Sequence, residues 1–199
     1  RSNTCVVRII MDKYFATDFT GARRKFLQST EVANAQLWQF KHPLTGPSGE
    51  EIGTDIVWLG AKNARNIVVA SSATHGIEGF CGSACQIGFL TENWESRLKA
   101  DTALVLVHAN NPHGFAYQRR VTENNIDLNR NFINFDAKIP EDLGYAALHS
   151  VLVPEAWDGP EREAADAVIE DYKAREGLPA FQQVTSRGQY THPNGLFYG

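Results

Sequence analysis

Short apolar runs, separated by Gly, Pro and polar clusters, dominate the first half of the chain and predict β-strands. Between some of these runs, apolar residues recur at three- and four-residue spacing, which is typical of an amphipathic helix. Phe15, Phe19, Ala22 and Phe26 show this spacing, and Thr17 or Asp18 can cap the helix. We therefore predict strands at 36–41, 54–59, 66–72 and 102–108 and helices at 14–30, 80–91 and 94–100.

The second half of the chain has a different pattern. Residues 109–140 show little periodicity and much Asn, Pro and Gly, and a loop of that length in a compact domain is usually functional. Pro160, an acidic first turn and Gly177 predict a helix over 161–175. A further helix is predicted at 141–152, a strand at 184–190, and turns at 42–49 and 191–199.

Strands that alternate with helices in this order are typical of an α/β sheet with crossover connections. We predict an α/β fold with a mixed, mostly parallel sheet between helices. The chain has 199 residues, of which 43% are hydrophobic, and this suffices for one domain over residues 11–199. Residues 1–10 precede the single methionine, Met11, and are either a tag remnant or a short first strand.

Charge and composition exclude several classes of partner. A net charge of −4 and a sequence pI of about 5.9 give no electrostatic reason to expect nucleic acid. Since no apolar run approaches the ~20 residues that cross a bilayer, no membrane association is expected. Three cysteines do not make a disulfide framework, and Cys81 and Cys85 are expected to be buried thiols on one helix face. The cytoplasm is the expected location.

His75 and Glu78 form the first candidate site. They follow the predicted strand 66–72 and precede the predicted helix 80–91, at the strand end where open α/β sheets place their sites. Zinc binds His nitrogen and carboxylate oxygen, so the pair can close on one metal ion. The structural alternative is a turn in which Glu78 favours the helix dipole.

Arg120, Asn129 and Arg130 form the second candidate site, on the loop over 109–140. Arg130 offers a planar fork that pairs with a carboxylate, and Asn129 is adjacent to it. Arg120 is placed to stabilise an oxyanion, with Arg119 as its alternative. The structural alternative is an ion pair between Arg130 and Asp127 among turn-forming Asn residues.

Three segments of the chain resemble, in the same order, motifs of the zinc carboxypeptidase superfamily. This superfamily includes the succinylglutamate desuccinylase and aspartoacylase branch. Nearest is an uncharacterised bacterial branch, the DUF2817 family. The segments are similar to the His-x-x-Glu zinc motif, to an Asn-Pro-x-Gly-Phe/Tyr segment and to an Asp-x-Asn-Arg-Asn-aromatic segment. They are His75-Gly76-Ile77-Glu78, Asn111-Pro112-His113-Gly114-Phe115 and Asp127-Leu128-Asn129-Arg130-Asn131-Phe132.

This resemblance implies a carboxypeptidase-like α/β/α sandwich, incomplete on its C-terminal side, and one zinc ion held by His75 and Glu78. It implies that Arg120 polarises the scissile carbonyl, and that Asn129 and Arg130 bind a terminal carboxylate. The implied activity is hydrolysis of a peptide or N-acyl amino acid amide bond, and the implied substrate carries a free carboxylate.

The sequence departs from the superfamily in one respect. The third zinc ligand, a His in an Asp-x-His setting, and a later general-base Glu are not visible, since His149 lies in a predicted helix and His192 in a turn. We therefore expect the chain to be a truncated piece of a longer protein, a fragment of a disrupted gene or a degraded natural form. In each case we expect it to bind zinc weakly or not at all. The alternative is a non-catalytic domain that binds a carboxylate ligand or a protein partner. An exposed sheet edge is expected to allow homo-oligomers.

Overall fold

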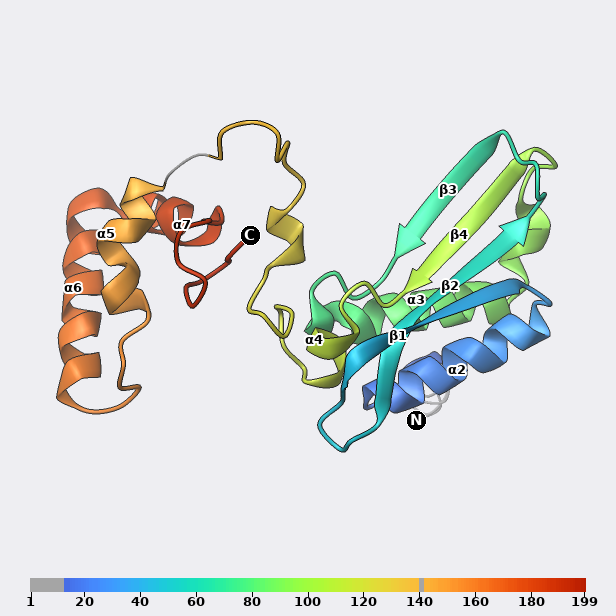
Figure 1. The fold of residues 1–199 in the computed structure, drawn as a ribbon, viewed down its shortest axis with the longest axis horizontal. Helices are drawn as coiled ribbons and strands as arrows, with labels where there is room; N and C mark the ends of the chain where they lie inside the picture. Colours follow the sequence, from blue (N-terminus) through green and yellow to red (C-terminus); the bar gives the residue numbers. More distant parts are fainter. Residues whose placement is uncertain (1–12, 140–141) are drawn as a thin grey trace, which may run out of the picture. The chain divides into compact units, whose positions relative to one another are not determined.

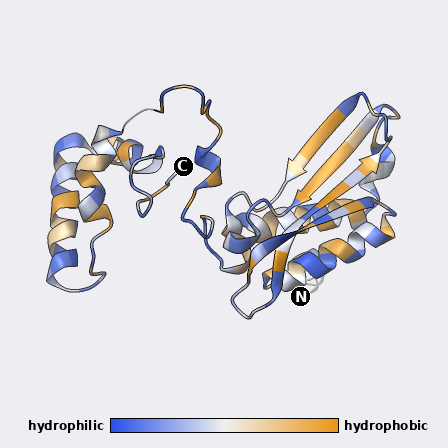
Figure 2. Cartoon of the chain, in the orientation of Figure 1, coloured by the Kyte–Doolittle hydropathy of each residue, from blue (hydrophilic) through white to orange (hydrophobic). Residues whose placement is uncertain are grey.

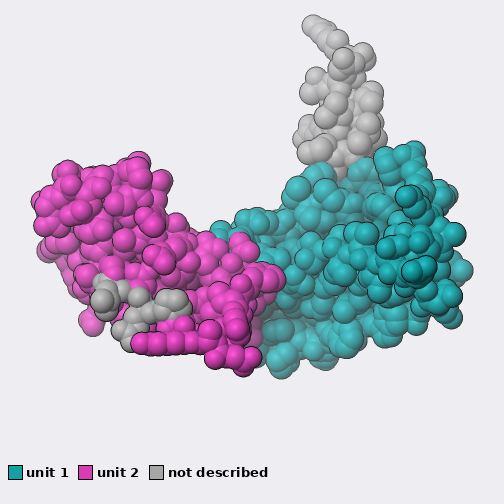
Figure 3. Space-filling model, turned by 90° about the horizontal axis from the view of Figure 1, so that it is seen from above, with its two compact units in different colours: residues 1–120 teal, residues 121–199 magenta. Residues whose placement is uncertain are grey.

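The computed structural model describes residues 13–139 and 142–199, so the two alternatives for residues 1–10 lie outside the described part. The chain divides into two compact units, 1–120 and 121–199, which are coloured separately in Figure 3. Each unit is described by itself, and the single domain over 11–199 stays a prediction.

A four-stranded sheet forms the centre of the first unit (Figure 1). Its strands lie in the order β1-β2-β4-β3. The β1–β2 and β2–β4 pairings are antiparallel and the β3–β4 pairing is parallel. The α/β class and the mixed sheet are confirmed, but antiparallel pairings outnumber the parallel one, unlike the expected parallel majority. The bounds are β1 (Gln36–Thr45), β2 (Glu51–Gly60), β3 (Asn66–Ser71) and β4 (Thr102–His108).

A tight hairpin between β1 and β2 explains the antiparallel start of the sheet. β1 runs to Thr45, so the predicted turn at 42–49 is shorter than expected and begins at Gly46. The amide of Gly46 donates to the carbonyl of Glu50, and Gly49 has the left-handed φ of 81° that glycine favours. A register irregularity between Lys41 and Thr45 admits Pro43 within the strand.

Two helices supply the core of the first unit. α2 (Phe19–Val32) begins at the N-cap Asp18, whose carboxylate accepts from the amide of Gly21 at 2.6 Å. α3 (Gly79–Thr91) follows the turn after β3. Their apolar side chains pack against alternate residues of β2 and β4, which point to one face of the sheet. This core contains Phe26, Val57, Leu59, Ile87, Leu90, Leu104 and Leu106.

β3 corresponds to the exposed sheet edge that the sequence predicts. β4 is its single neighbour among the described strands. Ile67, Val68 and Val69 are 53%, 52% and 64% exposed, and Figure 2 shows the strand as hydrophobic. Such an edge offers backbone groups and apolar side chains to another strand, yet association through it stays a prediction.

The second unit contains three longer helices, α5 (Leu143–Leu152), α6 (Pro160–Glu176) and α7 (Leu178–Ser186). The first two agree with the predicted helices, and Pro160 and Gly177 bound α6 as expected. The predicted strand at 184–190 is wrong, because α7 occupies its first residues. Pro179 in the first turn of α7 fits a helix start.

Short helical segments complete the described structure, and the loop over 109–140 contains two of them. They are the 3-10 segments η1 (Gly76–Glu78), η2 (Trp94–Arg97) and η3 (Leu128–Arg130), and the short helix α4 (Pro112–Ala116). No helix over 13–139 or 142–199 is long and apolar enough to cross a membrane.

Candidate functional site

His75 and Glu78 meet as predicted. His75 lies directly before η1, in extended conformation, and Glu78 ends this single turn before α3. Nδ1 of His75 lies 3.0 Å from Oε1 of Glu78. The His75 side chain is 9% exposed and that of Glu78 is 65% exposed, so the pair joins a buried ring to a solvent-facing carboxylate. The turn therefore brings one nitrogen and one oxygen donor to the same point.

The pair fits two positions of a zinc site. Zinc binds such donors at about 2.0–2.2 Å, so two ligands on one ion lie about 3–3.5 Å apart. The separation of 3.0 Å is compatible with this spacing without a large rearrangement. Over residues 13–139 and 142–199, no group of three or more His, Cys, Asp or Glu side chains is arranged to hold a metal. The described residues therefore place two candidate ligands at this point.

The backbone of Arg119 and Arg120 lies beside this turn. The amide of Gly76 donates to the carbonyl of Arg120 at 3.2 Å, and the amide of Ile77 donates to the carbonyl of Arg119 at 3.0 Å. The structure thus places the backbone of Arg120 beside the turn that carries His75 and Glu78, while the roles of these three residues stay predictions.

α4 holds the other side of the same loop. The amide of Arg119 donates to the carbonyl of Gly114 at 2.7 Å. Asn111, 2% exposed, is the N-cap of α4, and its Oδ1 accepts from the amide of Gly114 at 2.7 Å. The segment that resembles the Asn-Pro-x-Gly-Phe motif is therefore a structural support of the turn that carries His75.

A buried ion pair next to this region was missed by the sequence analysis. Asp55 on β2 is fully buried, and its carboxylate accepts from Nε and Nη2 of Arg23 at 2.8 and 3.0 Å. Nε2 of Gln39 donates to the same carboxylate at 3.1 Å. The hydrogen bond to Asp55 raises the pKa of the Arg23 guanidinium, while burial opposes it.

His108 bonds within the core of the first unit. It is fully buried at the end of β4, opposite Asp55 in the sheet, and its Nε2 lies 2.8 Å from the Ser83 hydroxyl. The ring also stacks on Phe26, with 4.4 Å between centroids. Burial lowers the pKa of His108 to about 4, and Asp55 partly offsets this. His108 is therefore a neutral core residue.

Asn129 and Arg130 lie in the second unit, so the structure does not test whether they share a site with His75. Nε and Nη2 of Arg130 donate to the carbonyl of Ser186 at 3.0 and 2.8 Å, and Nη1 donates to the carbonyl of Asn129. The carboxylate of Asp127, which is fully buried, accepts from the amide of Asn129 at 3.0 Å. Asp127 thus holds the loop through a backbone amide.

A cavity of about 310 Å³ adjoins the Arg130 guanidinium. Arg130, Arg187, Asn129 and Tyr190 are among the residues that line it. Such a set of donors suits an anion with planar oxygens, since guanidinium groups pair with carboxylates in a fixed geometry. Phe132, Ile133 and Ser186 complete the lining.

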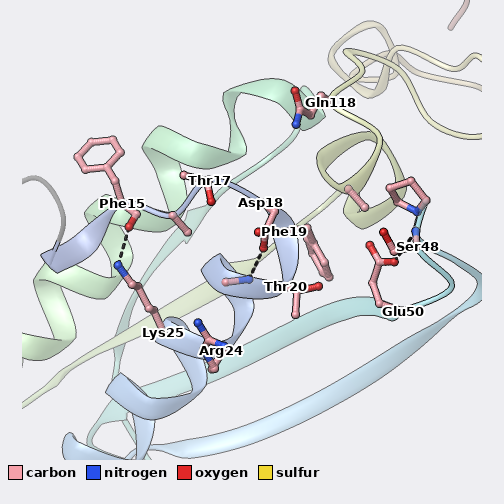
Figure 4. Close-up of a pocket in the computed structure, with 14 residues that line it drawn as sticks. Phe15, Thr17, Asp18, Phe19, Thr20, Arg24, Lys25, Ser48, Glu50 and Gln118 are labelled. Carbon is pink, nitrogen blue, oxygen red and sulfur yellow. Dashed lines mark hydrogen bonds between the residues drawn. The ribbon is translucent and has the colours of Figure 1, made fainter.

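A larger cavity, of about 590 Å³, contains none of the predicted site residues. It lies between the start of α2, the β1–β2 turn and the end of α4 (Figure 4). Two of its charged side chains bond to neighbouring backbone groups. Lys25 donates to the carbonyl of Phe15, and Glu50 accepts from the amide of Ser48.

The two cysteines of α3 differ from their prediction. Cys81 and Cys85 are free thiols on the helix, as expected, but both are exposed instead of buried. Partial burial and then the neighbouring Cys81 raise the pKa of the Cys85 thiol. The apolar character of the α3 sequence does not distinguish its covered face from its open one, which explains the error.

Comparisons with known proteins identify one family. The model of a family described as "Protein of unknown function (DUF2817)" matches residues 15–199. No curated protein matches the chain. Among solved structures, glutaminyl cyclase from Fimbriiglobus ruber is similar at 13% sequence identity with a TM-score of 0.33. That similarity covers 51% of this chain and 41% of the cyclase chain, and it is too weak to support an argument about function.

Proposed function

The chain belongs to the DUF2817 family, and on that premise we propose that it forms part of a zinc-dependent hydrolase of peptide or N-acyl amino acid amide bonds. The observation that carries the proposal is the His75–Glu78 pair, 3.0 Å apart, beside the loop of Arg119 and Arg120. The motif resemblance to the zinc carboxypeptidase superfamily supports the same assignment.

In this proposal, His75 and Glu78 would hold the metal from one side. A bound zinc ion would lower the pKa of its water and polarise the substrate carbonyl. Arg120 would add a positive charge where the oxyanion develops, since the hydrogen bonds to Gly76 and Ile77 fix the 119–120 backbone next to the ligands. The buried ring of His75 would exclude water from one side of the reacting centre.

Asn129 and Arg130 would bind the substrate carboxylate. Three of the five N–H groups of the Arg130 guanidinium donate to backbone carbonyls, which fixes its plane. The remaining two N–H groups can pair with a carboxylate without breaking those bonds. The adjoining cavity and the second cation, Arg187, support this role. The substrate would therefore carry a free carboxylate.

A hydrolysis assay with zinc tests the proposal, run on this chain and on the longest natural chain that contains it. Matched pairs of N-acyl amino acids are compared, one member with a free carboxylate and the other with an amidated one. We expect the free carboxylate to raise kcat/KM by at least about tenfold, because a charge-assisted bidentate pair is worth about 1.5–3 kcal/mol. Arg130→Lys should remove most of this preference, and Arg175→Lys, on the exposed face of α6, is its control.

Equal cleavage of both substrates would contradict the role of Arg130. Cleavage that persists in a chelator and in the His75→Ala variant would contradict the metal half of the proposal.

The second candidate function is a non-catalytic domain that binds carboxylates. The observation that favours it is that the described residues supply two metal ligands and no third. Carboxylate binding that requires Arg130, without turnover in either chain, would distinguish this function from the hydrolase.

A further inference from the structure

We propose that Asn111 is a positioning residue, which sets the backbone of Arg120 against the turn that carries His75 and Glu78. This inference rests on the proposed function, since it concerns how the proposed oxyanion-stabilising residue is fixed beside the proposed metal ligands. All of the residues involved lie within the first unit.

The two polar atoms of the Asn111 side chain form hydrogen bonds with two different segments. Its Oδ1 accepts from the amide of Gly114 at 2.7 Å and so closes the first turn of α4. Its Nδ2 donates to the carbonyl of Arg120 at 3.4 Å. Because the side chain is 2% exposed, water does not readily replace either bond.

The carbonyl of Arg120 therefore accepts from two sides. Gly76 donates from the turn that carries the proposed metal ligands, and Asn111 donates from the residues that follow β4. The backbone of Asn111 is itself tied to the end of β3, since its amide donates to the carbonyl of Ala73 at 3.0 Å. The result is a link from the sheet, through one amide side chain, to the 119–120 loop.

Close backbone contact makes this link specific. Gly76 packs directly on Gly114 and the Phe115 nitrogen, with no space for a side chain between them. A small shift of the 119–120 loop would therefore be passed to η1, where Glu78 lies. A hydroxyl or carboxylate oxygen at this position could cap α4 alone. The bond from Nδ2 to the Arg120 carbonyl is thus a second role of Asn111, beyond capping.

Two substitutions separate the cap from the positioning role. Asn111→Ala removes both side-chain bonds, whereas Asn111→Ser keeps an oxygen that can cap α4 and removes the donor to Arg120. Asn66→Ala is the control, because Asn66 lies at the opposite end of β3 with an exposed bond to Asp101. Hydrogen–deuterium exchange of the Gly76 and Ile77 amides and affinity for Co²⁺ are measured on the full chain.

We expect the exchange rates of the Gly76 and Ile77 amides to rise about fivefold or more in both Asn111 variants. This is the change that loss of one hydrogen bond makes in a local opening equilibrium. Co²⁺ affinity should fall in parallel, and Asn66→Ala should leave both readouts unchanged. If Asn111→Ser restores wild-type exchange, Asn111 is only a cap and the inference is overturned. If the wild-type chain binds no Co²⁺, the proposed function fails, while the exchange rates still decide the role of Asn111.

Discussion

Replacement of Asp55 by alanine is expected to lower the free energy of unfolding of the first unit by about 3–5 kcal/mol. Asp55 is fully buried, and the Arg23 side chain that it binds is 12% exposed. Removal of the carboxylate leaves the guanidinium partly buried without its charged partner and also removes the acceptor of Gln39. Chemical denaturation followed by circular dichroism measures the loss.

Two comparison variants test whether the loss of stability comes from the buried Asp55–Arg23 ion pair. Lys41→Ala breaks the exposed Lys41–Glu51 pair, with a distance of 3.0 Å, and should cost less than about 1 kcal/mol. The double variant Arg23→Met with Asp55→Leu removes both charges and should recover much of the stability, because a buried pair can be replaced by apolar groups at little cost. A loss below about 1 kcal/mol for Asp55→Ala would show that the pair is hydrated.

Replacement of Gly76 by alanine is expected to cost about 3 kcal/mol or more and to abolish the predicted metal half-site. An added methyl group would overlap the backbone of Gly114 and Phe115, which cannot move away as a flexible side chain could. The turn would separate from the 119–120 loop and break the bonds from Gly76 and Ile77. Denaturation and amide exchange at Ile77 measure the two effects.

Gly88→Ala is the matched control. Gly88 lies within α3, and an added methyl group there would meet the Tyr14 ring at 3.8 Å, an ordinary contact. Alanine in a helix interior is favoured over glycine by about 0.5–1 kcal/mol, so this variant should be neutral or more stable. Equal stability of the two variants would contradict the close packing of Gly76 on Gly114.

The sequence was most informative where one physical rule decided the outcome. The apolar strand over 102–108 and the helix that starts at Pro160 appear almost as predicted, because burial and capping agree there. The strand predicted at 184–190 failed, because so short a segment carries little periodicity, and Pro179 favours the start of a helix that runs to Ser186. Strand direction also depends on which strands become neighbours, and the crossover pattern did not reveal that β2 lies between β1 and β4.

The candidate site was predictable in its local part. His75 and Glu78 meet because they lie three positions apart on one turn, a distance that sequence spacing controls. The Asp55–Arg23 pair joins residues far apart in the chain, so spacing could not reveal it. One signal was present, since Asp55 shares the alternation of Val57 and Leu59 and is therefore a charge on the core face of β2.

Metal titration of the purified chain tests the central claim most directly. Co²⁺ and Zn²⁺ are titrated into the wild-type protein and into the His75→Ala, Glu78→Gln and His42→Ala variants. We predict weak binding at one site, reduced at least about tenfold in the first two variants, because loss even of a residue that supports a ligand costs that much. The His42→Ala variant should bind as wild type does. Equal affinity in all four proteins, or no binding by the wild-type chain, would contradict the assignment of His75 and Glu78 as metal ligands.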